Sequence, residues 1–156
     1  MAIEYWLVLE GDLPIDTVAR AAFPDPAERP AATGHANLLS NDLYDRYGYG
    51  VTIRAGHDGY FQGEADPEVD WLWEPQRFTQ LTFRIDKKDP QGALRNLLPV
   101  VARMLDVRSE DAAFLLNGDF VLLSRSNGAI AKHRRAAWWD HYGWVDEIVP
   151  GPSATA

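Results

Sequence analysis

The chain has 156 residues, a formal net charge of −8 at pH 7 and no cysteine. This length fits one domain, and 46% hydrophobic and 12% aromatic residues supply a core that needs no metal or disulfide. The lack of cysteine excludes disulfides, thiolate nucleophiles and cysteine-based zinc sites, and is compatible with a reducing cytoplasm. The negative charge disfavours nucleic acid as a partner and favours a basic protein.

The sequence predicts no targeting or membrane segment. Residues 1–6 have no basic region, Glu10 interrupts the first apolar stretch, and no later run approaches the roughly 20 apolar residues of a membrane span. We therefore expect no export, no membrane insertion and a cytoplasmic location. Residues 150–156 are small and uncharged, so we expect one domain over 1–149 followed by a frayed tail.

The first quarter of the chain predicts a strand, a helix and a long connection. Apolar residues alternate over 3–9, as in a strand. Asp12 as N-cap and Pro14 in the first turn predict a short amphipathic helix that ends before Pro24. Residues 24–41 contain three prolines, which predicts a connection without an element of its own, either mobile or functional.

The centre of the chain has the pattern of an antiparallel meander. Strand alternation over 51–54 and over 60–64, separated by a glycine-bounded turn at 56–59, predicts a hairpin. Residues 69–73 and 81–85 alternate in the same way and predict two further strands.

The second half predicts a helix and then short strands. Asp89-Pro90 is a cap followed by a proline, and an apolar stripe over 94–105 continues as the second helix. Asn117-Gly118 predicts a tight hairpin because both residues accept positive φ, and residues 126–128 predict a second turn. An aromatic segment over 134–142 has helical spacing.

Together these elements predict an α+β fold. We expect a single domain in which two or three helices pack on one face of a curved, mainly antiparallel sheet. A parallel, doubly wound sheet is disfavoured, because it requires strands and helices in regular alternation.

The sequence contains no motif typical of a catalytic, metal-binding or cofactor-binding site. The four histidines lack the close spacing of metal ligands on one element, and Ser124 and Ser126 lack a nucleophile elbow. We therefore predict no catalytic residue, no metal and no cofactor. One alternative remains open, a small enzyme or ligand-binding domain with a cleft near Trp138, Asp140 and His141.

Two charged segments stand out. The basic run over 132–135 is predicted to be a solvated junction between a strand and a helix. An acidic segment with two embedded tryptophans is our predicted partner-binding site, because carboxylates steer a basic partner and tryptophans anchor interfaces. The alternative interpretation is a solvated hairpin edge whose tryptophans turn into the core. The predicted site comprises Glu64, Asp66, Glu68, Asp70, Trp71, Trp73 and Glu74.

Several segments, in this order along the chain, resemble one known family. They are AIEY at 2–5, LEGD at 9–12, DLYDRYGYGV at 42–51, FRIDK at 83–87, LNG at 116–118 and WWDHYG at 138–143. The sequence is similar to the swarming-inhibition toxin immunity proteins of bacteria, the SitI type, over nearly its whole length. The resemblance implies a cytoplasmic protein that binds a toxin delivered between neighbouring cells, without enzyme activity or a cofactor.

Three functions therefore remain open from the sequence. The first is an immunity protein whose partner is a cognate toxin protein, blocked sterically. The second is the small enzyme or ligand-binding domain. The third is a structural, self-associating subunit, suggested by six tryptophans. For an immunity protein we expect a monomer or a weak homo-oligomer.

Overall fold

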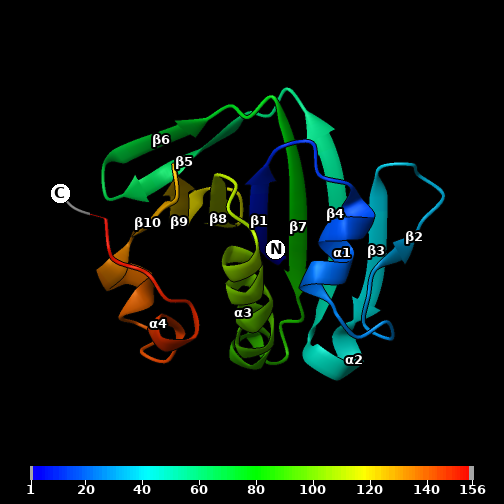
Figure 1. Ribbon diagram of the computed structural model, residues 1–156. Helices are drawn as coiled ribbons and strands as arrows, with labels where there is room; N and C mark the ends of the chain where they lie inside the picture. Colours follow the sequence, from blue (N-terminus) through cyan, green and yellow to red (C-terminus); the bar gives the residue numbers. More distant parts are fainter. Residues whose placement is uncertain (1, 155–156) are drawn as a thin grey trace.

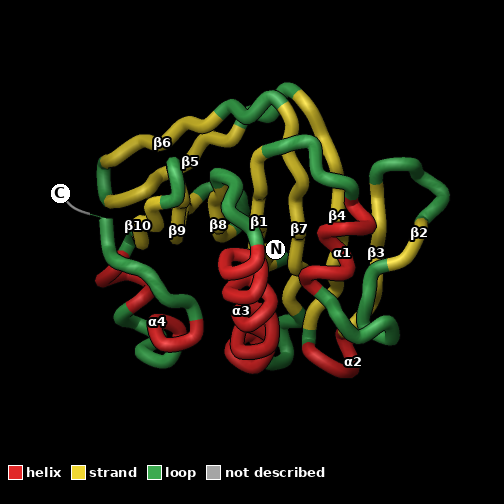
Figure 2. Tube along the Cα trace, viewed as in Figure 1, coloured by secondary structure: helices red, strands yellow, loops and turns green. Residues whose placement is uncertain are grey.

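One large sheet organises the chain in the computed structural model, which describes residues 2–154 (Figures 1 and 2). The strands are β1 (Ile3–Glu10), β2 (Ala31–Ala32), β3 (Leu38–Leu43), β4 (Tyr49–His57), β5 (Phe61–Asp66), β6 (Val69–Trp73), β7 (Arg77–Ile85), β8 (Ala112–Leu116), β9 (Phe120–Ser126) and β10 (Ala129–Lys132). The helices are α1 (Ile15–Ala22), α2 (Tyr44–Tyr47), α3 (Pro90–Val107), the π-helical turn η1 (Arg135–Trp139) and α4 (Val145–Ile148).

The strand order confirms the predicted fold class. Within residues 2–154 the order is β2-β3-β4-β7-β1-β8-β9-β5-β6, and β10 also pairs with β9. These named strands pair antiparallel except β5 and β9, which meet in parallel at Glu64 and Phe120. The helices lie on one face of the curved sheet (Figure 1), so the chain is an α+β domain.

Two apolar cores stabilise the domain, one on each face of the sheet. The larger core lies between the helices and the sheet, and the smaller one lies beneath β5 and β6 on the opposite face. The central strand β1 serves both, because Leu7 and Leu9 belong to the larger core and Val8 to the smaller. All three side chains are fully buried, each worth about 2 kcal/mol.

Helix α3 has the start that the sequence predicts and an end that it does not. Asp89 is the N-cap and accepts a hydrogen bond from Gly92 N at 3.0 Å. At the other end, the buried Arg125 of β9 donates to Leu105 O at 2.7 Å and to Glu110 O at 2.8 Å. A buried guanidinium thus satisfies one carbonyl of the last turn of α3 and one beyond it.

Two predictions about the first quarter are wrong. Helix α1 begins at Ile15 after Pro14, and no side chain among residues 2–154 caps it, so Asp12 is not its N-cap. Residues 24–41 are not free of elements, because they include β2 and part of β3, which pair with each other. The prolines lie before these strands, where they leave the sheet hydrogen bonds intact.

The predicted hairpin between 51–54 and 60–64 is also wrong. Strand β4 pairs with β3 and β7, and β5 pairs with β6. Residues 56–59 bend the chain instead of reversing it, because Asp58 N donates to Gln76 O at 2.7 Å and Gly59 N to Pro75 O at 2.8 Å. Residues 49–85 therefore form one long, bent two-stranded ribbon.

The turns of the second half are confirmed. Asn117 and Gly118 have φ of 54° and 69° and join β8 to β9, and Asn127 and Gly128 have φ of 51° and 81° before β10. The aromatic segment forms η1, and the Tyr142 amide donates to Trp138 O at 3.2 Å. Beyond α4 the chain returns to β10, where Ala154 N donates to Lys132 O at 2.8 Å.

Candidate partner-binding surface

The outer half of the ribbon, which we call the β5–β6 hairpin (residues 61–73), carries most of the predicted site. It folds over the sheet face that the helices leave uncovered (Figure 1). Its tip is the two-residue turn Pro67-Glu68, where Glu68 has φ of 63°. Proline followed by a residue with positive φ is the pattern of a type II turn.

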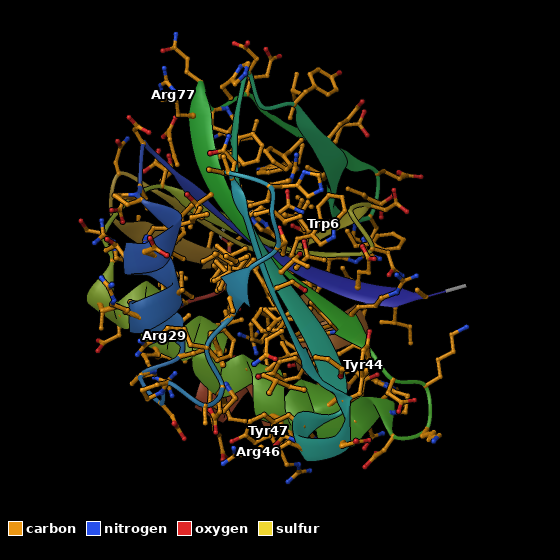
Figure 3. The ribbon with its side chains drawn as sticks, turned by 90° about the vertical axis from the view of Figure 1, so that its right-hand side faces the viewer. Trp6, Arg29, Tyr44, Arg46, Tyr47 and Arg77 are labelled. Atoms are coloured by element: carbon orange, nitrogen blue, oxygen red, sulfur yellow. The ribbon has the colours of Figure 1, made fainter. Side chains whose placement is uncertain are left out.

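The inner side of the hairpin is apolar and covers the smaller core. Phe61 meets the Phe78 ring edge-on at 5.1 Å, and Trp73 lies 5.8 Å from Phe61. Trp71 and Trp73 are half-buried against this core, with ring centroids 6.0 Å apart. In the side view of Figure 3, Trp6 lies on the hairpin side of the sheet, whereas Tyr47 lies beside the helices. The two predicted tryptophans therefore contribute to folding, with part of each ring accessible.

The outer side of the hairpin and its tip are acidic and open. Glu68, Asp70 and Glu74 are exposed, and two apolar side chains lie among them. Val69 is 50% exposed and Leu72 is 54% exposed. Exposed apolar side chains beside exposed carboxylates are the composition of a contact surface for a basic protein.

Two of the predicted carboxylates have partners within the chain. Arg134 Nη1 donates to Glu64 Oε1 at 2.7 Å, and the Arg134 backbone N–H donates to Asp66 Oδ1 at 3.0 Å. His133 Nδ1 lies 3.3 Å from Asp66 Oδ2. These contacts fasten the hairpin to the segment after β10, so the outward negative charge is concentrated at Glu68, Asp70 and Glu74.

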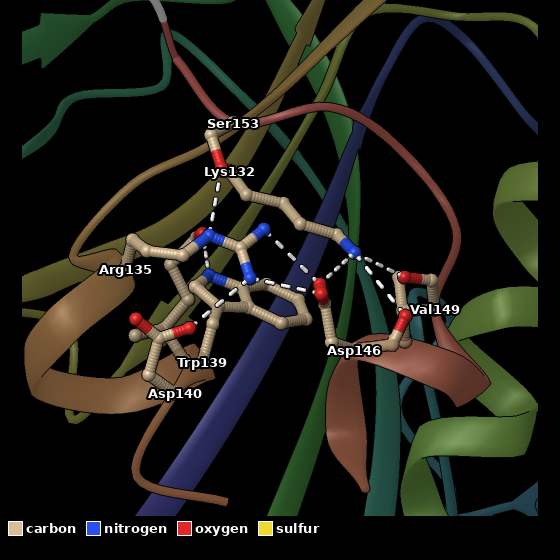
Figure 4. Close-up of polar contacts among 8 residues, drawn as sticks. Lys132, Arg135, Trp139, Asp140, Asp146, Val149 and Ser153 are labelled. Carbon is tan, nitrogen blue, oxygen red and sulfur yellow. Dashed lines mark hydrogen bonds and ion pairs between the residues drawn. The ribbon is translucent and has the colours of Figure 1, made fainter. Parts of the chain in front are cut away.

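The basic run 132–135 is therefore not a solvated junction, which corrects the prediction. The Lys132 side chain is 1% exposed, and its ammonium lies 2.6 Å from Asp146 Oδ1 and 4.5 Å from the centre of the Trp139 ring (Figure 4). Arg135 Nη1 lies 2.9 Å from Asp146 Oδ2. Arg135 and then Lys132 stabilise the carboxylate and lower the pKa of Asp146 to about 2. Charge pairing explains the burial of Lys132, because Asp146 supplies the counter-charge that a buried ammonium requires.

Ser124, His133 and Asp66 form a chain of contacts that sequence reasoning missed. Ser124 Oγ lies 2.9 Å from His133 Nε2, and the other ring nitrogen faces Asp66. A serine, a histidine and a carboxylate in this order can activate a nucleophile. However, Ser124 lies in the middle of β9, between Ala113 and Ala131 of the neighbouring strands, and not on a strand–helix elbow. Asp66 lies on β5, Ser124 lies on β9 and His133 directly follows β10, so no local sequence pattern predicts this arrangement.

A cavity of about 490 Å³ opens beside the hairpin tip. Ala65, Val69 and Trp71 give it an apolar wall, and Asp66 and Asp70 add carboxylates to its lining. A side chain from a partner that contacts the tip has room here.

The alternative cleft does not receive the same support. Trp138 is 5% exposed and its ring packs against Tyr5, Trp139 and Tyr142, so it cannot stack on a substrate without opening the core. The Asp140 carboxylate faces Arg135 at 3.4 Å, and the exposed His141 ring lies edge-on to Tyr142.

A second cavity, of about 320 Å³, lies at the other end of the sheet, on strands β1, β3, β4 and β7. Glu4, Tyr44 and Arg84 line it, and they come from three of the segments that carry the family resemblance. Glu4 and Arg84 face each other across β1 and β7, so the charges there are mixed.

Other kinds of site find no support in the described part of the chain. Among residues 2–154, no three histidine, aspartate or glutamate side chains are grouped to hold a metal ion. Over the same residues, none of the helices combines the length and apolar character that a membrane crossing requires.

Fold and surface thus define a small α+β domain that presents an acidic hairpin. Residues 3–143 match the family described as SitI3-like, and the chain belongs to that family. The match confirms the resemblance read from the sequence. No curated protein and no solved structure matches the chain.

Proposed function

We propose that the chain is an immunity protein that binds a cognate bacterial toxin in the cytoplasm and neutralises it by steric blocking. The observation that carries this proposal is the outer side of the β5–β6 hairpin. There, Glu68, Asp70 and Glu74 lie exposed on or directly beside β6, the strand of the exposed Leu72, while Glu64 and Asp66 hold the hairpin in place. Membership of the SitI3-like family supports the immunity class.

Binding to this surface requires no chemistry in the chain. The net charge of −8 attracts a basic toxin and raises its association rate. Contact with Leu72 and with the cavity beside Trp71 then excludes water and slows dissociation. A bound domain of this size covers an active or entry surface of the toxin.

Calorimetry with the toxin domain encoded beside the gene tests the proposal. We expect one-to-one binding that weakens at high salt, because exposed charges are screened over about 8 Å at physiological ionic strength. Asp70→Lys should weaken binding about tenfold or more at low salt. Asp106→Lys is the matched control, since Asp106 is also exposed but lies on α3. Absence of binding between two folded proteins would sink the proposal.

A hydrolase is the second candidate, and the contacts of Ser124 with His133 and of His133 with Asp66 favour it. An activated serine reacts with a fluorophosphonate probe. Stoichiometric labelling that Ser124→Ala abolishes, with Ser126→Ala as control, would establish a reactive serine. Without labelling, the three residues act only to fasten the hairpin.

A further inference from the structure

Strand β6 has one free backbone edge. Within residues 2–154 it pairs with β5 alone and ends the strand order of the sheet. In an antiparallel pair, two residues that face each other either exchange both backbone hydrogen bonds or direct both away from the pair. The direction of one amide therefore fixes the direction of the amides along both strands.

The backbone N–H of Glu64 shows which way the amides of β5 and β6 point. Its N–H donates to Asp119 O, in the turn between β8 and β9, at 2.8 Å, and therefore points away from β6. Glu64 faces Asp70 in the register, so the N–H and C=O of Asp70 point away from β5 as well. The direction alternates along a strand, so Leu72 also points outward, whereas Trp71 bonds to β5.

The outward groups have the arrangement that an additional strand requires. Asp70 and Leu72 each direct one donor and one acceptor to the free edge, two residues apart, and their side chains are exposed. The neighbouring strand is held firmly, because Glu64 is bonded both to the β8–β9 turn and to Arg134. A rigid edge loses little conformational entropy when a strand pairs with it.

Charge decides which strand fits this edge. Two β6 edges from two copies of the chain would bring Asp70, Glu68 and Glu74 of each copy close to those of the other, and like charges across paired strands are destabilising. A strand with lysine or arginine beside its pairing residues meets these carboxylates favourably. The edge is therefore suited to a basic partner and opposes self-association.

We propose that the toxin adds a basic β-strand to the free edge of β6 and pairs with the backbone of Asp70 and Leu72. This inference rests on the proposed immunity function and specifies how the toxin is held. Backbone pairing supplies affinity, and the carboxylates around Leu72 select a basic sequence.

Amide hydrogen exchange tests the pairing directly. The probe is the toxin domain encoded beside the gene, added to saturation as judged by calorimetry. In the free protein, the amides of Asp70 and Leu72 should exchange rapidly, whereas those of Trp71 and Trp73 should be protected by β5. In the complex, the first two should slow by about 100-fold or more, while protection of the tryptophan amides changes little.

A proline at residue 72 removes the outward amide without removing a bond to β5. Leu72→Pro should leave the melting temperature within a few degrees of the wild type, because proline is tolerated on an edge strand. It should weaken toxin binding by about 10- to 100-fold, through the lost hydrogen bond and an unsatisfied partner carbonyl. Leu72→Thr is the matched control, since it shortens the side chain, keeps the amide and should lose much less affinity.

The outcomes separate the two proposals. If the toxin binds but the amides of Asp70 and Leu72 remain unprotected, strand addition is wrong and the immunity function stands. Equal losses for Leu72→Pro and Leu72→Thr also overturn strand addition, because the side chain alone would then explain them. If these amides become protected in the free protein as its concentration rises, a second copy occupies the edge. A toxin that does not bind overturns both proposals.

Discussion

The ammonium of Lys132 lies 2.6 Å from the carboxylate of Asp146 and is almost completely buried, with 1% of the side chain exposed. Removing Asp146 leaves this cation without its counter-charge, and such a change costs about 3 kcal/mol or more. Removing Lys132 instead takes the buried charge away, and Arg135 still neutralises the carboxylate.

We therefore expect Asp146→Ala to lower the free energy of unfolding by about 3 kcal/mol and Lys132→Met by distinctly less. Urea denaturation of the two variants measures the difference. Equal losses would mean that both side chains act only through packing and that the buried charge is unimportant.

The same carboxylate predicts a pH dependence. The pKa of Asp146 falls from its ordinary value of 3.8 to about 2 in the folded protein, first through Arg135 and then through Lys132. A group whose pKa is lower when folded adds stability above its unfolded pKa and loses it as pH falls toward its folded pKa.

The stability difference between the wild type and Asp146→Asn should therefore be constant above about pH 5 and should shrink steadily toward pH 2. Chemical denaturation across this range is the measurement. A difference that persists undiminished at pH 2 would show that the charge of Asp146 is not its source.

Local features of the fold could be predicted because their signals lie within a few residues. Asn117-Gly118 accepts the positive φ of a tight turn, and the Asp89-Pro90 pair starts α3 as predicted. The central ribbon could not be predicted in the same way. The glycines at residues 56–59 are compatible with either a bend or a tight turn. Only the hydrogen bonds to the distant residues 75–76 show that the chain bends here.

The charge that the acidic segment presents to solvent also depends on contacts between residues that lie far apart in the sequence. The predicted acidic segment is real, but Arg134 neutralises Glu64, and His133 and the Arg134 amide hold Asp66. Glu64 and Asp66 lie on β5, whereas His133 and Arg134 follow β10, 67 to 70 residues further along the chain. The composition of the segment therefore could not show that these two carboxylates have partners. This is why the acidic segment could be found from the sequence, whereas its division into fastening and outward carboxylates could not.

The half-buried position of Trp73 predicts a stability role for a residue first considered as an anchor. Its ring covers Phe61 and part of the smaller core. Trp73→Ala should lower the free energy of unfolding by about 2 to 3 kcal/mol, somewhat less than for a fully buried tryptophan.

Denaturation followed by near-ultraviolet circular dichroism measures this loss, and Tyr60→Ala is the control, since Tyr60 is 63% exposed beside the hairpin. If Trp73→Ala costs no more than the control, the ring does not belong to the folded core.

The contact between His133 and Asp66 predicts a local effect at the hairpin. His133→Ala removes contacts to both Asp66 and Ser124, so we expect a loss of about 1 kcal/mol and faster amide exchange in β5 and β6. Exchange in β1 should be unchanged, because it is buried between β7 and β8. Uniformly faster exchange throughout the sheet would argue against a role confined to the hairpin.

Glu68 at the hairpin tip combines an exposed carboxylate with an unfavourable backbone conformation. Its φ of 63° lies in the left-handed region, where a residue with a Cβ atom costs roughly 1 kcal/mol more than glycine. Glu68→Gly should therefore raise the free energy of unfolding by up to about 1 kcal/mol, whereas Glu68→Ala should not raise it.

The same two variants separate conformation from charge in toxin binding. Both remove the carboxylate, so both should slow association at low salt by a similar factor, although only one relieves the strain. Stopped-flow association rates measure this effect. If Glu68→Gly alone alters binding, the shape of the hairpin tip determines recognition. If neither variant alters binding, the contact surface lies along β6 and not at the turn.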